Sequence, residues 1–168
     1  RNACKPGDII LTTGIHGLSK LGFLIQNKIN FDNEFSLNER LIIKSIEHFC
    51  RPRVYPNFLN NLLKTRSNKN IRRIGCTDSS DGLFQALQDL AIASNCKAII
   101  NYEKIPKDKD WPKGDKWDEY YFFGGEDYEL VFSLPKKWAE NLTKLDKNIN
   151  EIGFFTDGEP SIEFKDYK

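Results

Sequence analysis

Short apolar runs that alternate with helical patterns place the strongest constraint on how this chain folds. The run Asp-Ile-Ile-Leu-Thr-Thr at residues 8–13 has a continuous apolar centre, as expected of a strand buried in a sheet. Two late runs flank Asp157-Gly158, a turn signal that predicts a hairpin between them. The predicted strands cover residues 8–13, 74–77, 97–102, 128–133, 150–156 and 160–165.

Helical signals fill the intervals between these strands. Ser36-Leu37-Asn38-Glu39 has the form of a capping box and predicts a helix that ends before Pro52. The predicted helices begin near Leu18, Ser36, Asn57, Gly82 and Pro135. Two charge-rich segments, residues 66–73 and 104–116, are predicted to be loops. We therefore predict a single α+β domain over residues 1–168, with a mixed sheet covered by helices.

Composition excludes several classes of function. The 168 residues carry 25 basic and 24 acidic side chains, which gives no support for nucleic-acid or membrane binding through net charge. No apolar segment approaches the ~18 residues of a membrane span, and no signal peptide is visible. Because the sequence lacks methionine and begins at Arg1, we expect a fragment of a longer protein.

The four cysteines show no spacing typical of a metal site. Their neighbours are apolar or basic, which favours reduced thiols in a cytoplasmic protein over a disulfide framework. They are Cys4, Cys50, Cys76 and Cys96.

Two polar motifs carry the functional signal. The first, residues 76–83, places Asp78, Ser80 and Asp81 where a strand gives way to a helix. Amides at a helix start favour anions, and carboxylates beside a phosphate require a cation such as Mg²⁺ between them. Helix capping by Ser80 or Asp81 explains the same residues, and spacing alone leaves both interpretations open.

The second motif, Gly124-Gly125-Glu126-Asp127-Tyr128-Glu129-Leu130, joins a glycine pair to three acids. The glycines would let the backbone pass close to a ligand, with Glu126 accepting a hydrogen bond from it. A tight turn with exposed acids is the commoner reason for such a pattern. Asp127 is assigned no ligand, and Tyr128 is expected to pack on the core.

Other familiar chemistry is not indicated. His16 and His48 have no carboxylate at metal-ligand spacing, so a surface or core position is expected for each. Arg51 and Arg53 are expected to be surface residues. The sequence contains no phosphate-binding Walker loop, dinucleotide fingerprint or nucleophile elbow.

The two motifs together resemble the C-terminal domain of thiamine-monophosphate kinase. This family belongs to the superfamily of aminoimidazole ribonucleotide synthetase, selenophosphate synthetase and a hydrogenase maturation protein. Matching segments run through nearly the whole chain; they are Gly7–Gly14, Arg51-Pro52-Arg53, Asp78–Leu83, Ile105-Pro106, Gly124–Leu130 and Ile152-Gly153. Asp-x-Ser-Asp-Gly-Leu with Gly-Gly-Glu-Asp-Tyr-Glu-Leu is the combination specific to the kinase branch.

The resemblance implies that ATP phosphorylates thiamine monophosphate in an in-line, Mg²⁺-dependent reaction without a protein base. By position, Asp78 and Asp81 correspond to magnesium ligands and Ser80 to an ATP contact. Glu126 corresponds to a contact with thiamine monophosphate, and Tyr167 is the candidate for a C-terminal aromatic contact. The family also has an N-terminal nucleotide-binding domain that is not in this chain, and it forms a homodimer. We therefore expect the 168 residues alone to be inactive.

Two alternatives stay open at this point. The chain could belong to another ATP-using synthetase of the same superfamily, which a substrate screen would distinguish. It could also be a non-catalytic ligand-binding domain, and metal-dependent nucleotide binding would discriminate that case.

Overall fold

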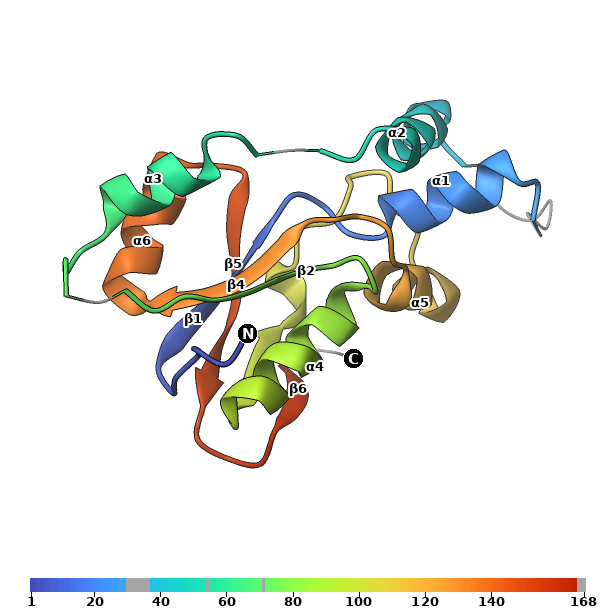
Figure 1. The fold of residues 1–168 in the computed structure, drawn as a ribbon. Coiled ribbons are helices and arrows are strands. Elements are labelled where there is room, and N and C mark those ends of the chain that lie inside the picture. Colours follow the sequence, from blue (N-terminus) through green and yellow to red (C-terminus); the bar gives the residue numbers. More distant parts are fainter. Residues whose placement is uncertain (30–36, 54, 71, 166–168) are drawn as a thin grey trace.

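The computed structural model describes residues 1–29, 37–53, 55–70 and 72–165 and is built around a six-stranded mixed sheet (Figure 1). The strand order is β2-β4-β1-β5-β3-β6. The strands are β1 (Asp8–Thr13), β2 (Gly75–Asp78), β3 (Lys97–Asn101), β4 (Leu130–Pro135), β5 (Ile149–Thr156) and β6 (Ser161–Lys165). Neighbours are antiparallel except β3 and β6, which are parallel. The predicted mixed sheet and α+β class are confirmed.

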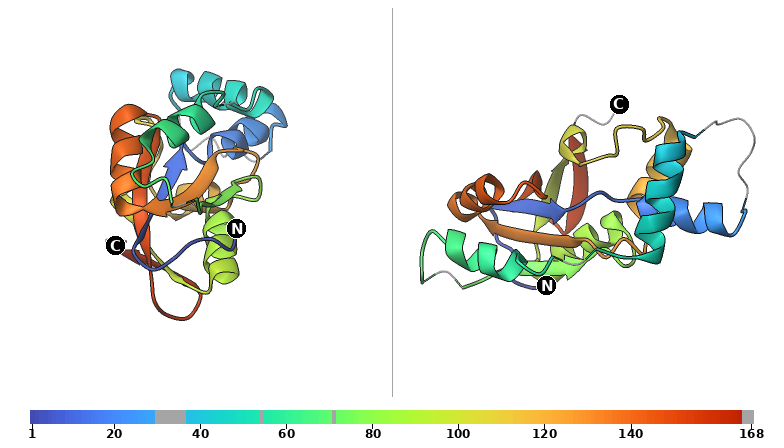
Figure 2. Two further views of the ribbon diagram at one scale, coloured as in Figure 1. Left: turned by 60° about the vertical axis from the view of Figure 1, so that its left-hand side comes forward. Right: turned by 90° about the horizontal axis from the view of Figure 1, so that it is seen from above.

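Helices cover both faces of the sheet and one of its ends. They are α1 (Leu18–Gln26), α2 (Glu39–Cys50), α3 (Phe58–Thr65), α4 (Leu83–Ser94), α5 (Asp115–Phe123) and α6 (Lys136–Leu145), with a 3-10 turn at Tyr102–Lys104. Helix α4 lies on one face, and α3 and α6 lie together on the other (Figure 1). Helices α1, α2 and α5 gather at one end, which gives the molecule an elongated outline (Figure 2). None of the helices in the described residues has the length and apolarity to cross a bilayer.

The sheet separates two hydrophobic clusters. Ile10 and Val131 point into the cluster under α4, whereas their neighbours Leu11 and Phe132 point into the cluster under α3 and α6. This alternation follows from the two-residue period of a strand. Trp138 of α6 is fully buried, and its ring N–H donates to a backbone carbonyl of α3 at 2.8 Å. Both faces of the sheet are therefore packed, which leaves its ends for function.

The predicted hairpin of residues 150–156 and 160–165 is wrong. Both strands form, but β3 lies between them and pairs with each. The apolar residues of β3, Ala98, Ile99 and Ile100, are all buried, so this strand takes a position with a neighbour on either side. Strand β6 alternates exposed and half-buried residues, as suits a sheet edge. The turn signal was local, whereas the pairing was decided by burial.

The predicted capping box is also wrong in its details. Ser36 lies outside the described residues, and α2 begins at Glu39 rather than three residues earlier. Its N-cap is Asn38, whose side chain accepts from the backbone N–H of Arg40 at 2.8 Å. Glu39 is therefore the first helical residue and cannot serve as the third.

Helix α5 was not predicted, because it follows directly on the charge-rich loop. Its buried residues Trp117, Tyr121 and Phe122 anchor it to the rest of the fold.

Candidate active site

The two polar motifs lie against each other at one end of the sheet. Asp78 is the last residue of β2 and pairs with Leu130, the first residue of β4. Beyond that pair, Glu129 and Ser79 exchange two hydrogen bonds, of 2.9 and 3.1 Å. The backbone N–H of Glu126 then donates to the carbonyl of Ser80 at 2.8 Å. The structure thus brings Asp78, Ser80, Asp81 and Glu126 to one place.

Glycines make this close approach possible. A Cβ built at Gly125 would overlap the backbone carbonyl of Ser80. Gly82 has a φ of +95°, which favours glycine, and a Cβ there would lie 3.0 Å from the carbonyl oxygen of Phe122. The glycine pair of the second motif therefore brings backbone against backbone.

Helix capping does not account for the first motif. Helix α4 begins at Leu83 with Gly82 at its N-cap position and no side-chain cap. The Asp78 carboxylate instead accepts from the N–H of Ser80 at 3.2 Å and from its hydroxyl at 2.7 Å. Within the described residues, no hydrogen bond or ion pair engages the exposed Asp81 carboxylate. Both acids face solvent, as a metal-binding role requires.

Asp78 and Asp81 do not form a complete metal site by themselves. In the part of the chain that the structure describes, no three His, Cys, Asp or Glu side chains converge in a way that could hold an ion. Mg²⁺ is usually held by one or two carboxylates, several waters and the phosphates of a substrate. Two exposed carboxylates fit that incomplete type of site.

A cavity of about 560 Å³ opens beside the motifs. Its polar side carries Ser80, Asp81 and Glu126, and Lys20 of α1 adds one positive charge. The remaining lining residues include three phenyl rings, from Phe23, Phe49 and Phe123. The rings of Phe23 and Phe49 meet edge to face at 5.7 Å. A ligand that combines aromatic rings with charged groups suits these walls.

The residues after the glycine pair alternate between solvent and interior. Glu126 and Tyr128 are exposed and adopt positive φ angles of 70° and 53°, so β4 begins at Leu130 instead of Tyr128. Tyr128 is 43% exposed, and the expectation that it packs on the core is wrong. Its hydroxyl donates to Glu126 at 3.0 Å, and this hydrogen bond raises the pKa of Tyr128.

Asp127 points inward, which sequence reasoning missed. It is 1% exposed, and its carboxylate accepts from the N–H groups of Gly17 at 2.6 Å and Ser19 at 2.9 Å, at the start of α1. Burial raises the pKa of Asp127 to about 6, although the hydrogen bonds from Ser19 and Gly17 act in the opposite direction. Asp127 and Glu129 are two residues apart, so an extended segment that exposes Glu126 turns both of them to the opposite side. This spacing was the signal that could have revealed the inward direction of Asp127.

Glu129 is the second buried acid of this segment, with no exposed surface. It accepts from the Thr13 hydroxyl at 2.5 Å, and His48 Nε2 lies 3.6 Å from its other oxygen. Burial acts to raise the pKa of Glu129, but its interactions with His48, Thr13 and Tyr55 outweigh burial, and the pKa is lowered. The other ring nitrogen of His48, Nδ1, is 3.1 Å from the Ser19 hydroxyl and 3.7 Å from Asp127.

His16 and His48 are both core residues, one of the two positions expected for them. His16 contacts the Thr12 hydroxyl through Nε2 at 2.7 Å, and burial lowers the pKa of His16 to about 4. Arg51 and Arg53 are exposed, as predicted. The four cysteines are free thiols, also as predicted. Tyr167 lies outside the described residues.

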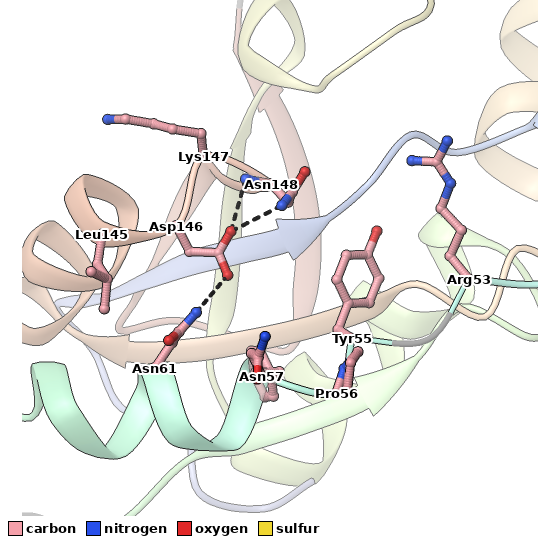
Figure 3. Close-up of a pocket in the computed structure, with 10 residues that line it drawn as sticks. Arg53, Tyr55, Pro56, Asn57, Asn61, Leu145, Asp146, Lys147 and Asn148 are labelled. Atoms are coloured by element: carbon pink, nitrogen blue, oxygen red, sulfur yellow. Dashed lines mark hydrogen bonds between the residues drawn. The ribbon is translucent and has the colours of Figure 1, made fainter.

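A second cavity, of about 550 Å³, lies between the start of α3 and the segment after α6 (Figure 3). Asp146 is its acidic residue, and its carboxylate is already occupied by Asn61 at 3.1 Å and by Asn148 at 3.0 Å. Arg53 and Tyr55 stand on the opposite side (Figure 3). None of the motif residues lines this cavity. The cavity between the two motifs is therefore the better candidate for the active site.

Comparison with known proteins agrees with this geometry. The family model "AIR synthase related protein, C-terminal domain" matches residues 5–165. The chain belongs to this family. The match confirms the resemblance that the two motifs indicated.

Individual relatives add detail. A thiamine-monophosphate kinase of Prochlorococcus marinus is 35% identical over 158 residues, which cover 94% of this chain and 47% of that protein. A structure of AaThiL complexed with AMPPCP and TMP is 25% identical with a TM-score of 0.74, covering 99% of this chain and 52% of that one. The Stenotrophomonas maltophilia thiamine-monophosphate kinase structure is 22% identical with a TM-score of 0.74. The match covers 98% of this chain and 52% of that one. The chain spans about half the length of the curated relatives it matches.

Proposed function

We propose that this chain is the C-terminal part of an ATP- and Mg²⁺-dependent kinase that converts thiamine monophosphate to thiamine diphosphate. The observation that carries the proposal is the cavity in which Asp81 and Glu126 adjoin three phenyl rings. The kinase names of the relatives agree with it.

The cavity matches the chemistry of thiamine monophosphate. Its cationic thiazolium ring is attracted to the faces of aromatic side chains, and Phe23, Phe49 and Phe123 supply such faces. Glu126, which lines the cavity, would accept a hydrogen bond from the aminopyrimidine ring. Its positive φ and the hydrogen bond from Tyr128 hold it at the cavity wall.

The first motif would serve the phosphates. Asp78 and Asp81 are the residues that would hold Mg²⁺, which supplies positive charge between the donor and acceptor phosphates. Ser80 would contact ATP, since its hydroxyl can rotate from Asp78 toward a phosphate oxygen. The acid pair and the aromatic walls meet at Asp81, so a phosphate bound at the acids and rings bound at the walls can belong to one molecule.

No protein base is needed for this reaction. The acceptor is a phosphate whose second pKa is near ~6, so it is largely ionised at neutral pH. The two histidines are buried and neither lines the cavity. Catalysis would then come from positioning and from neutralising charge, as in other phosphoryl transfers.

The rest of the active site would come from a longer protein. We propose an N-terminal nucleotide-binding domain, in keeping with a chain that spans about half of its relatives. A homodimer of the intact chain and a cytoplasmic location are further parts of the proposal.

The metal role can be tested in the full-length protein. We expect Asp78→Asn and Asp81→Asn each to lower kcat roughly a hundredfold, the effect of losing ~3 kcal/mol of charge stabilisation, and to raise the Mg²⁺ concentration needed for activity. Asp115→Asn, an exposed acid in the first turn of α5, is the matched control. Normal turnover with unchanged Mg²⁺ dependence in both variants would refute the metal assignment.

The substrate role of Glu126 has a separate test. A charge-assisted hydrogen bond is worth ~1.5–3 kcal/mol, so Glu126→Gln should raise KM for thiamine monophosphate roughly ten- to a hundredfold while KM for ATP stays nearly constant. Glu119→Gln, an exposed acid of α5, is the control. Metal-dependent use of ATP with a different acceptor would instead favour a synthetase, and ligand binding without turnover would favour a binding domain.

A further inference from the structure

We infer that Asp127 and His48 are positioning residues for the cavity, acting through a buried polar network that joins three of its walls. The network consists of Asp127, Ser19, His48, Glu129 and Thr13. The inference rests on the proposed function, because it assigns these residues to the binding of that function's substrate.

The link from Asp127 to α1 fixes the first wall. Helix α1 has Gly17 at its N-cap position, and glycine has no side chain with which to cap the helix. Asp127 supplies the cap from a distant part of the sequence, with one carboxylate oxygen for each of two amides. Lys20 and Phe23 line the cavity from the same short helix. A shift of Asp127 would therefore move both.

The link through His48 fixes the second wall. His48 lies on α2 with its ring between the two buried carboxylates, 3.7 Å from Asp127 and 3.6 Å from Glu129. Its Nδ1 also meets the Ser19 hydroxyl, so α2 is tied to α1 as well as to the acid segment. The next residue, Phe49, lines the cavity and packs edge to face on Phe23.

The third wall is the acid segment itself. Glu126 precedes Asp127 and lines the cavity, while Asp127 and Glu129 anchor the segment from behind. Three of the five network residues are next to a cavity residue in the sequence: Asp127 to Glu126, Ser19 to Lys20 and His48 to Phe49, and Ser19 also lines the cavity itself. This arrangement fixes the spacing of the three walls.

Packing alone would not call for such a network. Burying two carboxylates carries a desolvation penalty, and apolar side chains of similar volume often pack such a site at equal or greater stability. Hydrogen bonds differ from apolar contacts in fixing direction, and a binding site held by its surrounding residues in the productive geometry gains from that direction.

The test uses the full-length protein with Asp127→Asn and His48→Gln. Because a displacement of about 1 Å can cost roughly a hundredfold, we expect KM for thiamine monophosphate to rise roughly ten- to a hundredfold in both, with KM for ATP within about twofold of wild type. One substitution alters a carboxylate and the other an imidazole, so a shared rise would not come from the loss of one kind of group. If one variant fails to fold, the other carries the test.

Asp8→Asn is the matched control. Asp8 is an equally buried carboxylate that accepts from a backbone amide at 2.9 Å and pairs with Arg73, but it begins β1 at the end remote from Thr13. It should lower the melting temperature without changing either KM. An equal rise of KM in Asp8→Asn, or no rise in the two network variants, would overturn the inference.

Hydrogen exchange separates this inference from the proposed function. In Asp127→Asn, the amides of Gly17 and Ser19 should exchange about tenfold faster than in wild type, whatever the protein phosphorylates. Unchanged exchange at these amides would overturn the positioning role. A wild-type protein that fails to phosphorylate thiamine monophosphate, with faster exchange in the variant, would refute the proposed function and leave the positioning role supported.

Discussion

At the residue scale, the segment from Gly125 to Glu129 decides the character of the site. Glu126 and Tyr128 hold positive φ angles that cost of order 1–3 kcal/mol each in a residue other than glycine. The buried side chains of Asp127 and Glu129 keep the segment in this shape from behind. Strain of this kind persists only where the surrounding structure enforces it, and it is found at ligand sites.

Gly125→Ala should separate the two motifs. The new Cβ would overlap the carbonyl of Ser80, which is backbone and cannot move alone, so we expect a loss of about 1–3 kcal/mol in unfolding free energy and weaker binding of thiamine monophosphate. Gly158→Ala is the comparison: its φ is +139° but its nearest contact is at 3.4 Å. That change should lower stability and leave binding intact. Urea unfolding and substrate titration of the full-length variants check both, and normal binding in Gly125→Ala would contradict the prediction.

His16 should make stability depend on pH. Its pKa is lowered by burial from 6.5 to about 4, and Glu129 and His48 are the titratable groups facing it. Between pH 6.5 and about 4 the unfolded chain binds a proton at this residue that the folded chain does not. The free energy of unfolding is therefore unaffected by this residue's titration above pH 6.5 and decreases as the pH falls to about 4. The stability difference between wild type and His16→Gln should therefore shrink by up to about 3 kcal/mol from pH 7 to pH 4. Urea unfolding of both proteins over that pH range measures the difference. A difference in unfolding free energy that stays constant from pH 7 to pH 4 would show that His16 does not titrate in this way.

At the element scale, the start of α2 illustrates how local chemistry sets a boundary. Asn38 satisfies a backbone amide that the helix itself cannot, whereas Asn57 occupies the same position before α3 and makes no side-chain cap. Both are asparagines at an N-cap, so they form a natural pair for measuring the worth of the cap.

Asn38→Ala should cost about 1 kcal/mol of unfolding free energy, the usual value for a lost N-cap. Asn57→Ala should cost little, because no capping hydrogen bond is lost there. Urea unfolding of the two variants measures the difference. Equal losses would mean that the hydrogen bond of Asn38 is not what stabilises α2.

Sequence reasoning succeeded where structure is local and failed where it depends on distant partners. The run at 8–13 became β1 with the same bounds, because a continuous apolar run is buried wherever it pairs. The place of β3 between β5 and β6 could not be read from the Asp157-Gly158 turn. The motif acids were found from their types, but the inward direction of Asp127 needed α1 and His48, which are remote in sequence.

At the scale of the whole molecule, the chain holds only part of the proposed chemistry. Two exposed carboxylates and a substrate cavity lie at one end of the sheet, and the described residues contain no complete metal site. We therefore predict that the 168-residue chain alone does not phosphorylate thiamine monophosphate at a measurable rate. Activity should return when the proposed N-terminal domain is added and the two reassociate. Robust turnover by the rigorously purified chain would contradict this prediction.

The placement of β1 at the middle of the sheet has a consequence for synthesis on the ribosome. Its partners are β4 and β5, at Leu130–Pro135 and Ile149–Thr156, so β1 is synthesised well before the two strands with which it pairs. Pairings between such distant segments fold slowly, and the apolar run Ile9-Ile10-Leu11 stays unpaired while the nascent chain lengthens. The domain should therefore close its sheet only after translation of its last third, and a molecular chaperone that shields the first strand should increase the yield of folded protein.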